Sequence, residues 1–424
     1  MALLVSSTFL ALTPKIEAQQ STVDWWPMFH YDSAHTGSSD SAGPLTNQTL
    51  WKFETGNALE YSAPAVADGV AYVGSQDSTF YALNAATGSK LWSFTAGYNI
   101  KSVADVVGNV VYFGSLDDRV YALDTRTGKT VWNFTTGNQV YSSPNVVDGI
   151  LYIGSNDHFV YALNATNGGK IWSFEANSYV WSSPAVIDGV VYVTSFNYLY
   201  AINARTGKEI WSFEPKEPTY SSPAVVGGVV YFGSNDHNLY AINAANGKKI
   251  WNYSTNGFVE SSPAVAEGIV YFGSDDNSIY ALNSKTGQKL WNYKTGNDID
   301  SDPAVANGIV YIGSEDDYVY ALNAKTGGIV WSYKTGAPVE SFIAVANGVV
   351  YTGSNDNYVY AIGASTTGQV SSSPTTSPLP SIQELPPWAA FLLSIITAAV
   401  LIGVIKSKRG NTFARQQNSL KEIL

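Results

Sequence analysis

The sequence has no cysteine and few charged residues, and both shortages narrow what the chain can do. It has 424 residues with no Cys, four His and 2 Met, and charged residues make up 13% of it. The absence of thiols excludes a disulfide framework, a thiolate metal site and a cysteine nucleophile. Its 23 Lys and Arg are outnumbered by 34 Asp and Glu, so the formal net charge is −11. A nucleic-acid partner is not expected, because phosphate binding needs clustered basic side chains.

What the sequence does contain is one unit, repeated along most of its length. Tyr231–Trp251 (YFGSNDHNLYAINAANGKKIW) is a representative copy, and a truncated copy begins at Tyr351. The tryptophans that mark the unit are spaced 41, 40, 40, 39, 40, 40 and 40 residues apart. These docking tryptophans are Trp51, Trp92, Trp132, Trp172, Trp211, Trp251, Trp291 and Trp331. A period of about 40 residues with short, Gly-punctuated strands is typical of propeller blades, so one large domain is expected.

Each unit is interpreted as four antiparallel strands. Pairs such as Glu267-Gly268 join the first two strands, and they favour a type I′ turn because both residues need positive φ. The next turn carries a recurrent aspartate, Asp276 in this unit, which is expected to bond backbone N–H groups rather than to act in catalysis. Thr286-Gly287 then leads to the outer strand with its Trp. Apolar residues on both faces require blade to stack on blade.

The phase of the repeat predicts how the ring closes. Seven units are complete, whereas the eighth, Ser341–Ala364, has no Trp after it, and Trp51 lies on a strand with no unit before it. We predict an all-β fold over residues 49–365. It is an eight-bladed β-propeller of four-stranded antiparallel blades, whose N- and C-terminal ends join non-covalently through the Trp51 strand.

Residues 1–19 are interpreted as a signal peptide. Their apolar run, Ala2–Leu12, is too short to span a bilayer, and Ala18 offers a small residue for cleavage. A buried N-terminal strand is the alternative. No Lys or Arg precedes the run, so the sequence leaves open whether the recorded start is complete.

Residues 20–48 form a non-repeat N-terminal segment that contains His30 and His35. Two His without a nearby carboxylate or Cys cluster fall short of a metal ligand set, so no metal site is predicted. A packed plug or edge cover is expected instead.

The C-terminal end is interpreted as a membrane anchor. A Ser/Thr/Pro-rich stalk over residues 366–387 precedes Trp388–Ile405, which has 18 uncharged residues and is just long enough for one transmembrane helix. Basic residues open the tail over residues 406–424, so the positive-inside rule places the tail in the cytoplasm and the propeller outside the cell. Four asparagines in Asn-x-Ser/Thr sequons are glycosylation candidates: Asn47, Asn133, Asn164 and Asn252.

The motif at Tyr121–Trp132 and Tyr320–Trp331 resembles the tryptophan docking motif of pyrroloquinoline quinone (PQQ) repeat propellers. That family includes quinoprotein dehydrogenases, the BamB envelope assembly scaffold and surface proteins. The usual Asp of the motif survives only as Asp124, and Asn replaces it in most other units. The dehydrogenase resemblance would imply PQQ, calcium, a catalytic Asp and often a disulfide between adjacent cysteines. That disulfide cannot form here, and no residue can be carried over to a metal site.

The position just before the Ser of each inner strand varies while the repeat around it is strict. Four of these residues are aromatic and three, in neighbouring blades, are acidic. They are Tyr61, Lys101, Tyr141, Trp181, Tyr220, Glu260, Asp300 and Glu340. In an up-and-down blade this position lies at the mouth of the central channel, where a ring could hold a cation, a sugar or a peptide. The alternative is a set of variable, solvated loop residues.

The fourth blade is one residue short, and aromatic residues stand near its shortened turn. Tyr179, Phe196 and Tyr198 are predicted on the same rim as Trp181. An exposed aromatic cluster marks a binding surface, although these rings could equally fill the space left by the deletion.

These observations predict a membrane-anchored, cell-surface propeller that acts as a non-catalytic binding, adhesion or scaffold module. Its expected partner is a protein or carbohydrate at the channel mouth, the propeller is expected to be monomeric, and no catalytic residue or cofactor is predicted. A PQQ-dependent dehydrogenase with calcium is one alternative. A BamB-like assembly scaffold is the other, although the lipidated Cys of that scaffold is missing.

Overall fold

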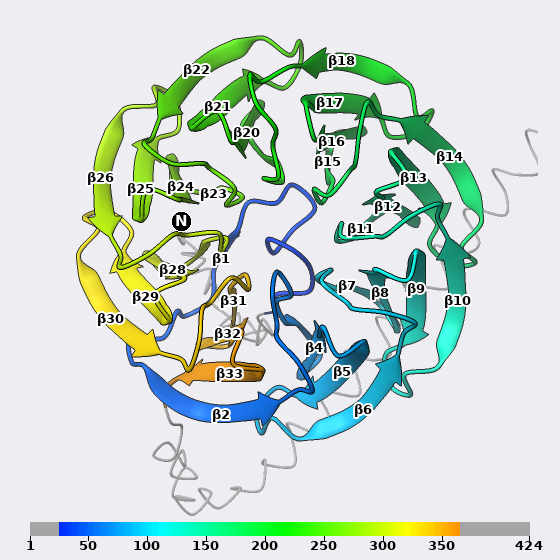
Figure 1. Ribbon diagram of the computed structural model, residues 1–424, viewed down its shortest axis with the longest axis horizontal. Coiled ribbons are helices and arrows are strands. Elements are labelled where there is room, and N and C mark those ends of the chain that lie inside the picture. The colour runs from blue at the N-terminus through cyan, green and yellow to red at the C-terminus, as the bar shows by residue number, and fades with distance from the viewer. Residues whose placement is uncertain (1–24, 365–424) are drawn as a thin grey trace, which may run out of the picture. The chain divides into compact units, whose positions relative to one another are not determined.

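The computed structural model describes residues 25–364, and every regular element in that range is a β-strand. Eight sheets stand around a central axis, each contributing one blade of a ring (Figure 1). Within each blade the four successive strands pair antiparallel. The predicted eight-bladed propeller is therefore confirmed.

The blades are built from strands of three to seven residues, with the shortest strand innermost. In the first four blades the strands are β3 (Ala65–Ala67), β4 (Val70–Gly74), β5 (Thr79–Asn84), β6 (Lys90–Thr95), β7 (Asp105–Val107), β8 (Val110–Ser115), β9 (Arg119–Asp124), β10 (Thr130–Thr135), β11 (Asn145–Val147), β12 (Ile150–Gly154), β13 (Phe159–Asn164), β14 (Lys170–Glu175), β15 (Ala185–Ile187), β16 (Val190–Ser195), β17 (Tyr198–Asn203) and β18 (Glu209–Phe213). In the next three they are β19 (Ala224–Val226), β20 (Val229–Ser234), β21 (Asn238–Asn243), β22 (Lys249–Ser254), β23 (Ala264–Ala266), β24 (Ile269–Ser274), β25 (Ser278–Asn283), β26 (Lys289–Lys294), β27 (Ala304–Ala306), β28 (Ile309–Gly313), β29 (Tyr318–Asn323) and β30 (Ile329–Lys334).

The eighth blade closes the ring. It consists of β31 (Ala344–Ala346), β32 (Val349–Gly353), β33 (Tyr358–Gly363) and, from the other end of the chain, β2 (Gln48–Glu54). β2 pairs antiparallel with β33, with Trp51 opposite Ala361. The predicted non-covalent closure through the Trp51 strand is confirmed.

The turns adopt the conformations that their residues favour. Glu267 and Gly268 have φ values of 48° and 79°, as a type I′ turn requires. The recurrent aspartates are structural, as predicted. In the seventh blade Asp316 accepts the backbone N–H of Gly296 at 2.6 Å and the hydroxyl of Tyr320 at 2.7 Å.

Each docking tryptophan ties its blade to the next one along the chain. The indole N–H of Trp251, for example, donates to the carbonyl of Ser284 at 3.1 Å, and its ring packs against Gly287. At the eighth blade the acceptor comes from the N-terminal side of the chain. There the carbonyl of Pro44, which lies just before β2, accepts the Trp331 indole N–H at 2.9 Å.

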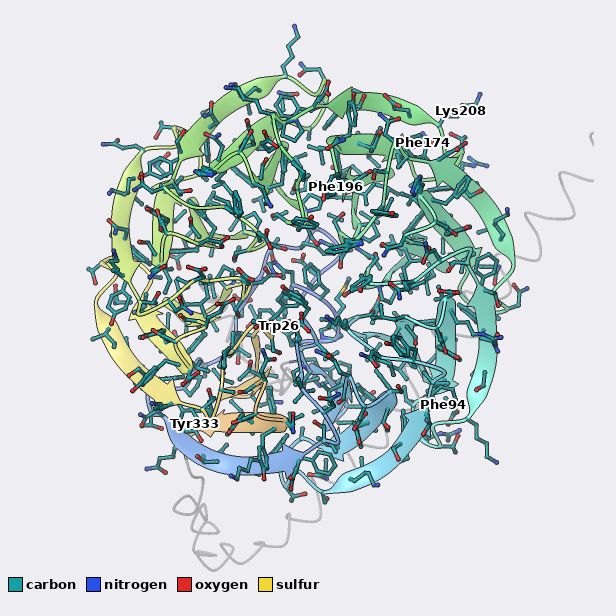
Figure 2. The ribbon with its side chains drawn as sticks, in the orientation of Figure 1. Trp26, Phe94, Phe174, Phe196, Lys208 and Tyr333 are labelled. Atoms are coloured by element: carbon teal, nitrogen blue, oxygen red, sulfur yellow. The ribbon has the colours of Figure 1, made fainter. Side chains whose placement is uncertain are left out.

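Residues 25–39 pass around the inside of the ring and pack against its innermost strands as a plug, one of the two arrangements expected for this segment (Figure 1). Trp26 lies near the centre of the ring, whereas Lys208 points outward from its rim (Figure 2). Six backbone carbonyls of this segment accept N–H groups of six innermost strands at 2.6–3.0 Å. The pairs are Trp26 with Val66, Pro27 with Val106, Ser33 with Val186, Ala34 with Val225, Thr36 with Val265, and Gly37 with Val305. β1 (Ser38–Ser39) then pairs parallel with β27.

The expected signal peptide, stalk, transmembrane helix and cytoplasmic tail lie outside the described residues. Within residues 25–364 no helix is long and apolar enough to cross a membrane.

Candidate functional site

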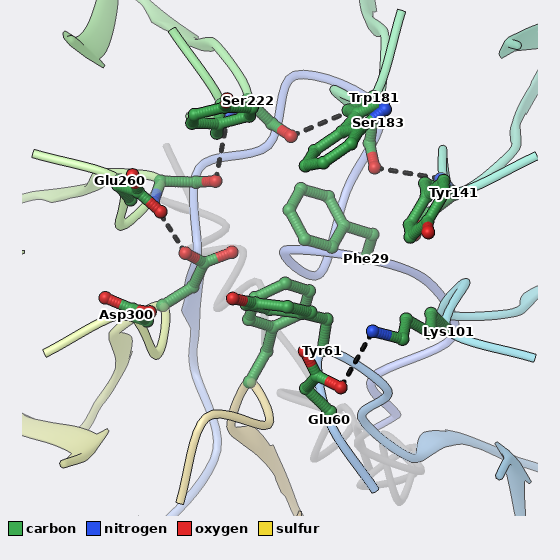
Figure 3. A pocket seen from close by; sticks show the side chains of 15 residues that line it. Phe29, Glu60, Tyr61, Lys101, Tyr141, Trp181, Ser183, Ser222, Glu260 and Asp300 are labelled. Atoms are coloured by element: carbon green, nitrogen blue, oxygen red, sulfur yellow. Dashed lines mark hydrogen bonds and ion pairs between the residues drawn. The ribbon is translucent and has the colours of Figure 1, made fainter. Parts of the chain in front are cut away.

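The residues predicted at the channel mouth line one cavity, of about 410 Å³. We call this cavity the cup (Figure 3). Seven of the eight predicted mouth residues line it, all except Glu340. Its full lining is Phe29, Glu60, Tyr61, Lys101, Tyr141, Ser143, Trp181, Ser183, Tyr220, Ser222, Glu260, Ser262, Asp300, Asp302 and Phe342. The Glu340 carboxylate is held nearby by the side-chain amide of Asn355, at 2.8 Å.

Three aromatic rings from consecutive blades form one wall of the cup. Trp181 lies between Tyr141, whose ring centroid is 4.8 Å away, and Tyr220, at 4.9 Å. The wall is a ready surface for a flat or cationic group, since 38% of the Trp181 surface remains exposed.

Two phenylalanine rings stand among these residues and narrow the cup. Phe29, from the N-terminal segment, and Phe342, from the eighth blade, meet edge to face at 5.2 Å. Tyr61 contacts Phe342 at 6.4 Å. The sequence did not single out either phenylalanine, because neither occupies the position that varies before the inner Ser.

The side of the cup opposite Lys101 is acidic (Figure 3). Burial, and then repulsion by Asp275, raises the pKa of the Asp300 carboxyl well above its ordinary range. Burial likewise raises the pKa of Glu260, and the Asn235 amide that donates to Glu260 at 2.9 Å partly offsets the rise. At neutral pH part of this acidic group is therefore held protonated.

Lys101 is the one basic side chain among the described residues that line the cup, and it already has partners. Its ammonium lies 2.7 Å from a carboxylate oxygen of Glu60. The same nitrogen stands 5.4 Å from the ring centroid of Tyr61 and 5.8 Å from that of Tyr141.

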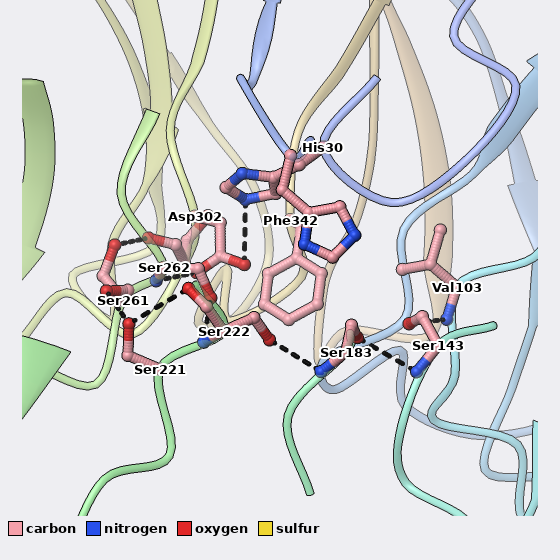
Figure 4. Close-up of polar contacts among 12 residues, drawn as sticks. His30, Val103, Ser143, Ser183, Ser221, Ser222, Ser261, Ser262, Asp302 and Phe342 are labelled. Atoms are coloured by element: carbon pink, nitrogen blue, oxygen red, sulfur yellow. Dashed lines mark hydrogen bonds and ion pairs between the residues drawn. The ribbon is translucent and has the colours of Figure 1, made fainter. Parts of the chain in front are cut away.

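A chain of inter-blade hydrogen bonds holds the cup in shape (Figure 4). Each backbone N–H donates to the side chain at the equivalent position of the next blade, a period of about 40 residues further on. Ser143 donates to Ser183 at 3.0 Å, and Ser183 donates to Ser222 at 2.9 Å. The chain continues through Ser262 to the Asp302 carboxylate. These bonds fix the alignment of neighbouring blades two residues after each of the mouth residues from Tyr141 to Asp300.

The two histidines of the N-terminal segment serve this framework. The Nε2 of His30 lies 3.1 Å from the Asp302 carboxylate, and both side chains are buried. His35 has its Nδ1 3.2 Å from the Pro223 carbonyl, and burial lowers its pKa to about 3, so it stays neutral. Neither histidine belongs to a group of three or more His, Cys, Asp or Glu that could hold a metal, since the described residues contain none.

The aromatic residues predicted on the rim of blade four do not gather into one cluster. Phe196 packs edge to face on Tyr220, at 5.8 Å, so it supports the aromatic wall. Tyr179 instead contacts His158, and Tyr198 stacks on Tyr200. Only Phe196 of the three is therefore tied to the cup by ring contacts.

Three residues missed by the sequence reasoning hold carboxylates at or beside the mouth. Each occupies the position directly before a recurrent aspartate. Gln76 donates to Glu60 at 2.5 Å, and Asn235 and Asn355 hold Glu260 and Glu340. The signal was present, because this position varies from blade to blade as the mouth position does.

A family model described as outer membrane protein assembly factor BamB matches residues 41–144, 117–198, 195–299 and 294–384, more than half of the chain. The chain belongs to this family of PQQ-repeat propellers. No curated protein sequence matches it.

Solved PQQ-repeat structures share its fold. A europium-containing methanol dehydrogenase superposes with a TM-score of 0.70 at 13% identity, covering 81% of this chain and 99% of that one. BamB from Moraxella catarrhalis gives 0.64 at 19% identity, covering 75% and 98%. Quinohemoprotein alcohol dehydrogenase from Comamonas testosteroni gives 0.68 at 15% identity, covering 81% of each chain. At these identities the likeness concerns the fold alone.

Membership of a family with quinoprotein dehydrogenases raises the question of whether the cup suits PQQ with a metal ion. PQQ is a tricarboxylate, and the cup presents the carboxyl groups of Glu60, Glu260 and Asp300 to it. Among the described residues that line the cup, Lys101 supplies the one ammonium group, and it is already paired with Glu60. The described residues also contain no group of three or more His, Cys, Asp or Glu that could hold a metal ion between these carboxyl groups and PQQ. With no free cation and no metal ligand set, this donor set does not fit PQQ.

The sequon asparagines of this PQQ-repeat propeller differ in how far their side chains are engaged. Asn133 and Asn252 are exposed on outer strands, and Asn47 is exposed before β2. The Asn164 side chain instead accepts the backbone N–H groups of Thr166 and Asn167. A glycan attaches to the amide nitrogen, and Asn164 uses its amide oxygen for these bonds. The amide nitrogen is engaged instead in Asn47, which donates to the Ser332 carbonyl, and in Asn252, which donates to the Asn238 side chain, both at 2.8 Å.

Proposed function

We propose that this PQQ-repeat propeller is a non-catalytic binding module that captures its ligand in the cup. The observation that carries the proposal is the cavity of about 410 Å³, walled by the stacked rings of Tyr141, Trp181 and Tyr220. A concave site with aromatic walls and a few converging polar groups is the usual form of a small-ligand site.

The rest of the proposal concerns where the module works. The sequence of residues 388–405 supports a single transmembrane helix, and the basic residues after it support an outward-facing propeller. The cup would then be open to ligands outside the cell, such as a carbohydrate or a segment of another protein.

Thermal melting of the full chain with a panel of small ligands tests the binding function. A ligand that binds only the folded state stabilises it by about 2.7 kcal/mol at a hundredfold excess over Kd, which raises the melting temperature. We expect a ligand of the cup to raise the midpoint of the parent and of a Tyr179→Ala control, but not of Trp181→Ala. Tyr179 is a matched control because it is exposed, lies two residues away and contacts His158 instead of the cup rings.

Two results would overturn this proposal in different ways. A melting shift with PQQ plus calcium, accompanied by dye-linked alcohol oxidation, would make the protein a dehydrogenase. Recovery of the same membrane proteins with the parent chain and with Trp181→Ala, without any ligand for the cup, would make it an assembly scaffold.

A further inference from the structure

The charges around the cup are unbalanced. Four carboxyl groups line it, those of Glu60, Glu260, Asp300 and Asp302, against the single ammonium of Lys101. Glu60 is neutralised by Lys101, and Asp302 has His30 beside it. Glu260 and Asp300 have no basic partner among the described residues that line the cup.

The contacts of Lys101 show how the cup binds an ammonium group. Its nitrogen is held by one carboxylate and lies close to two tyrosine rings. A cation near an aromatic face and a carboxylate gains both the quadrupole attraction of the ring and the charge pairing. One side of the cup is therefore a filled ammonium site, supplied by the chain itself.

The other side offers the same groups without the cation. Trp181 and Tyr220 present aromatic rings. Burial, and then the nearby negative charge of Glu260, raises the pKa of the Tyr220 hydroxyl. Asp300 lies next to Glu260 on the same wall (Figure 3).

We propose that the cup binds the ammonium group of an organic cation, placed between the rings of Trp181 and Tyr220 and the carboxylates of Glu260 and Asp300. The inference rests on the proposed binding function and names the chemical class of its ligand. A free quaternary amine and a lysine side chain of a peptide both supply such a group.

The raised pKa of Asp300 supports a cationic ligand. Desolvation raises the pKa of Asp300 most, and the carboxyl groups of Asp275, Glu260, Glu315 and Glu340 raise it further. A bound cation favours the ionised form of these groups, so it lowers their pKa values and expels a proton. Affinity should therefore rise as the pH increases from about 6 to 9, and binding should release protons.

Isothermal titration of the full chain with choline tests the proposal. The matched ligand is 3,3-dimethyl-1-butanol, which has the shape of choline without its charge. We expect choline to bind and the alcohol to bind at least about tenfold more weakly, because the cation–π and charge terms are lost. Titrations in buffers of different ionisation enthalpy should show proton release for choline. This ligand pair needs no variant, so the test survives if a substitution disturbs the fold.

A second pair of ligands distinguishes the sources of the ammonium group. N-acetyl-lysine methylamide is compared with its norleucine counterpart, which lacks the amine. Preference for the lysine compound over choline identifies a peptide side chain as the natural ligand, and the reverse preference identifies a free quaternary amine.

Variants locate the site. Trp181→Ala and Asp300→Asn should each weaken choline binding about tenfold, within the range of a partly desolvated cation–π or charge contact. Tyr179→Ala and Asp188→Asn are the controls. Asp188 is exposed at a hairpin tip where other blades have Asn, so its replacement should leave binding unchanged.

Two outcomes separate the inference from the function on which it rests. If choline and its neutral counterpart bind equally, or a neutral sugar binds and depends on Trp181 while cations do not, the cup is a binding site but the ammonium inference is wrong. If no probe depends on Trp181, both the inference and the proposed function fail.

Discussion

At the residue scale, the Asp105 carboxylate takes the place of a backbone carbonyl as a hydrogen-bond acceptor. The N-terminal segment supplies a carbonyl to the innermost strand of most blades, but in the third blade the Asp105 carboxylate accepts the Val146 N–H at 2.7 Å. The carboxyl group is 2% exposed, and burial raises its pKa to about 7. In the next blade the equivalent position is Asn145, so the repeat itself offers a neutral replacement.

The first prediction is that Asp105→Asn stabilises the protein in a pH-dependent way. The folded state holds the Asp105 proton more tightly than the unfolded state, so its contribution to stability is full below about pH 4 and is lost as the pH rises to about 7. Each pKa unit corresponds to about 1.4 kcal/mol. The variant keeps an acceptor for Val146 without the charge, so its melting temperature should rise relative to the parent between pH 4 and 7.

Melting curves of both proteins over this range are the measurement. His35, with its lowered pKa, destabilises both proteins alike as the pH falls, so its effect cancels in the difference. A difference in melting temperature that does not change with pH would show that Asp105 titrates normally.

The second prediction concerns the glycine on which each docking tryptophan packs. Gly287 has a φ of 69°, and a Cβ there would lie 2.8 Å from the Trp251 ring. Gly308 has a φ of 72°, but a Cβ there would meet nothing within 4 Å. Both Ala substitutions strain the backbone by about 1 kcal/mol, and Gly287→Ala should cost about 1–3 kcal/mol more because it overpacks the indole.

Chemical denaturation measures both variants against the parent. Gly308→Ala isolates the backbone effect because it adds no contact. Equal losses in free energy of unfolding would mean that the indole moves aside freely and that the tryptophan docking contributes little to stability.

At this scale the sequence predicted the role of a residue wherever the same local conformation recurs along the repeat. Asp316 and Gly287 are fixed by turn geometry that recurs in most blades, so their roles followed from the pattern. Trp181 and Asp300 could be placed at the mouth because they occupy the same position of the repeat. The contact of Lys101 with Glu60 joins residues 41 positions apart, and neighbouring blades had to be built before it could be found.

At the element scale, β2 is the element on which ring closure depends. It supplies the outer strand of a blade whose other strands come from the far end of the described chain, and its Trp51 donates to the Ala85 carbonyl at 2.8 Å. Trp51 also packs on Gly88 of the first blade. One strand thus joins the first and eighth blades.

The third prediction is that Trp51→Ala lowers the free energy of unfolding by about 3–5 kcal/mol, the usual cost of truncating a buried aromatic residue. The loss should also make the ends of the ring accessible, so limited proteolysis should cut near β2 before it cuts elsewhere. Leu45→Ala, in the same segment but 67% exposed, is the control and should leave both readouts unchanged. Cleavage spread evenly over the blades of Trp51→Ala would contradict a role at the point of closure.

The N-terminal segment is the element that the sequence described least well. Its residues lie outside the repeat and were expected to form a plug or an edge cover, but the sequence did not identify their partners. Carbonyls of Trp26, Ser33 and Gly37 bond strands from the first, fourth and seventh blades. Backbone carbonyls are the same in every residue, so no side-chain pattern encodes which blade each one meets.

At the scale of the whole molecule, radial repetition converts one variable position into one site. Seven of the eight blades place the residue before the inner Ser in the cup, so Tyr61, Trp181 and Asp300 converge although 239 residues separate the first from the last. The strict positions of the repeat keep this frame rigid. The residue at the variable position can therefore differ between blades while the fold stays the same.

The carbonyls of the N-terminal segment bond to the blades in chain order. We therefore expect the segment to stabilise a ring of eight blades more than a ring of seven. The fourth prediction is that deleting residues 221–260 destabilises the protein even though the blades remain in register. The deletion joins Tyr220 to Ser261 and so removes the fifth blade. The carbonyls of Ala34, Thr36 and Gly37, which bond the fifth to seventh blades in the parent, then no longer face their own partners. Each buried N–H left without an acceptor costs about 1–3 kcal/mol.

Differential scanning calorimetry makes the comparison, with an eight-bladed control in which residues 261–300 replace residues 221–260. The control has eight blades and the same Tyr220–Ser261 junction as the deletion variant. It should therefore melt near the parent as one cooperative unit. The deletion variant should melt at least about 5 °C lower, since each lost kcal/mol shifts the midpoint of a large domain by a few degrees. If the deletion variant melts with the control, the ring accepts seven blades, and the inner segment follows the blade number instead of setting it.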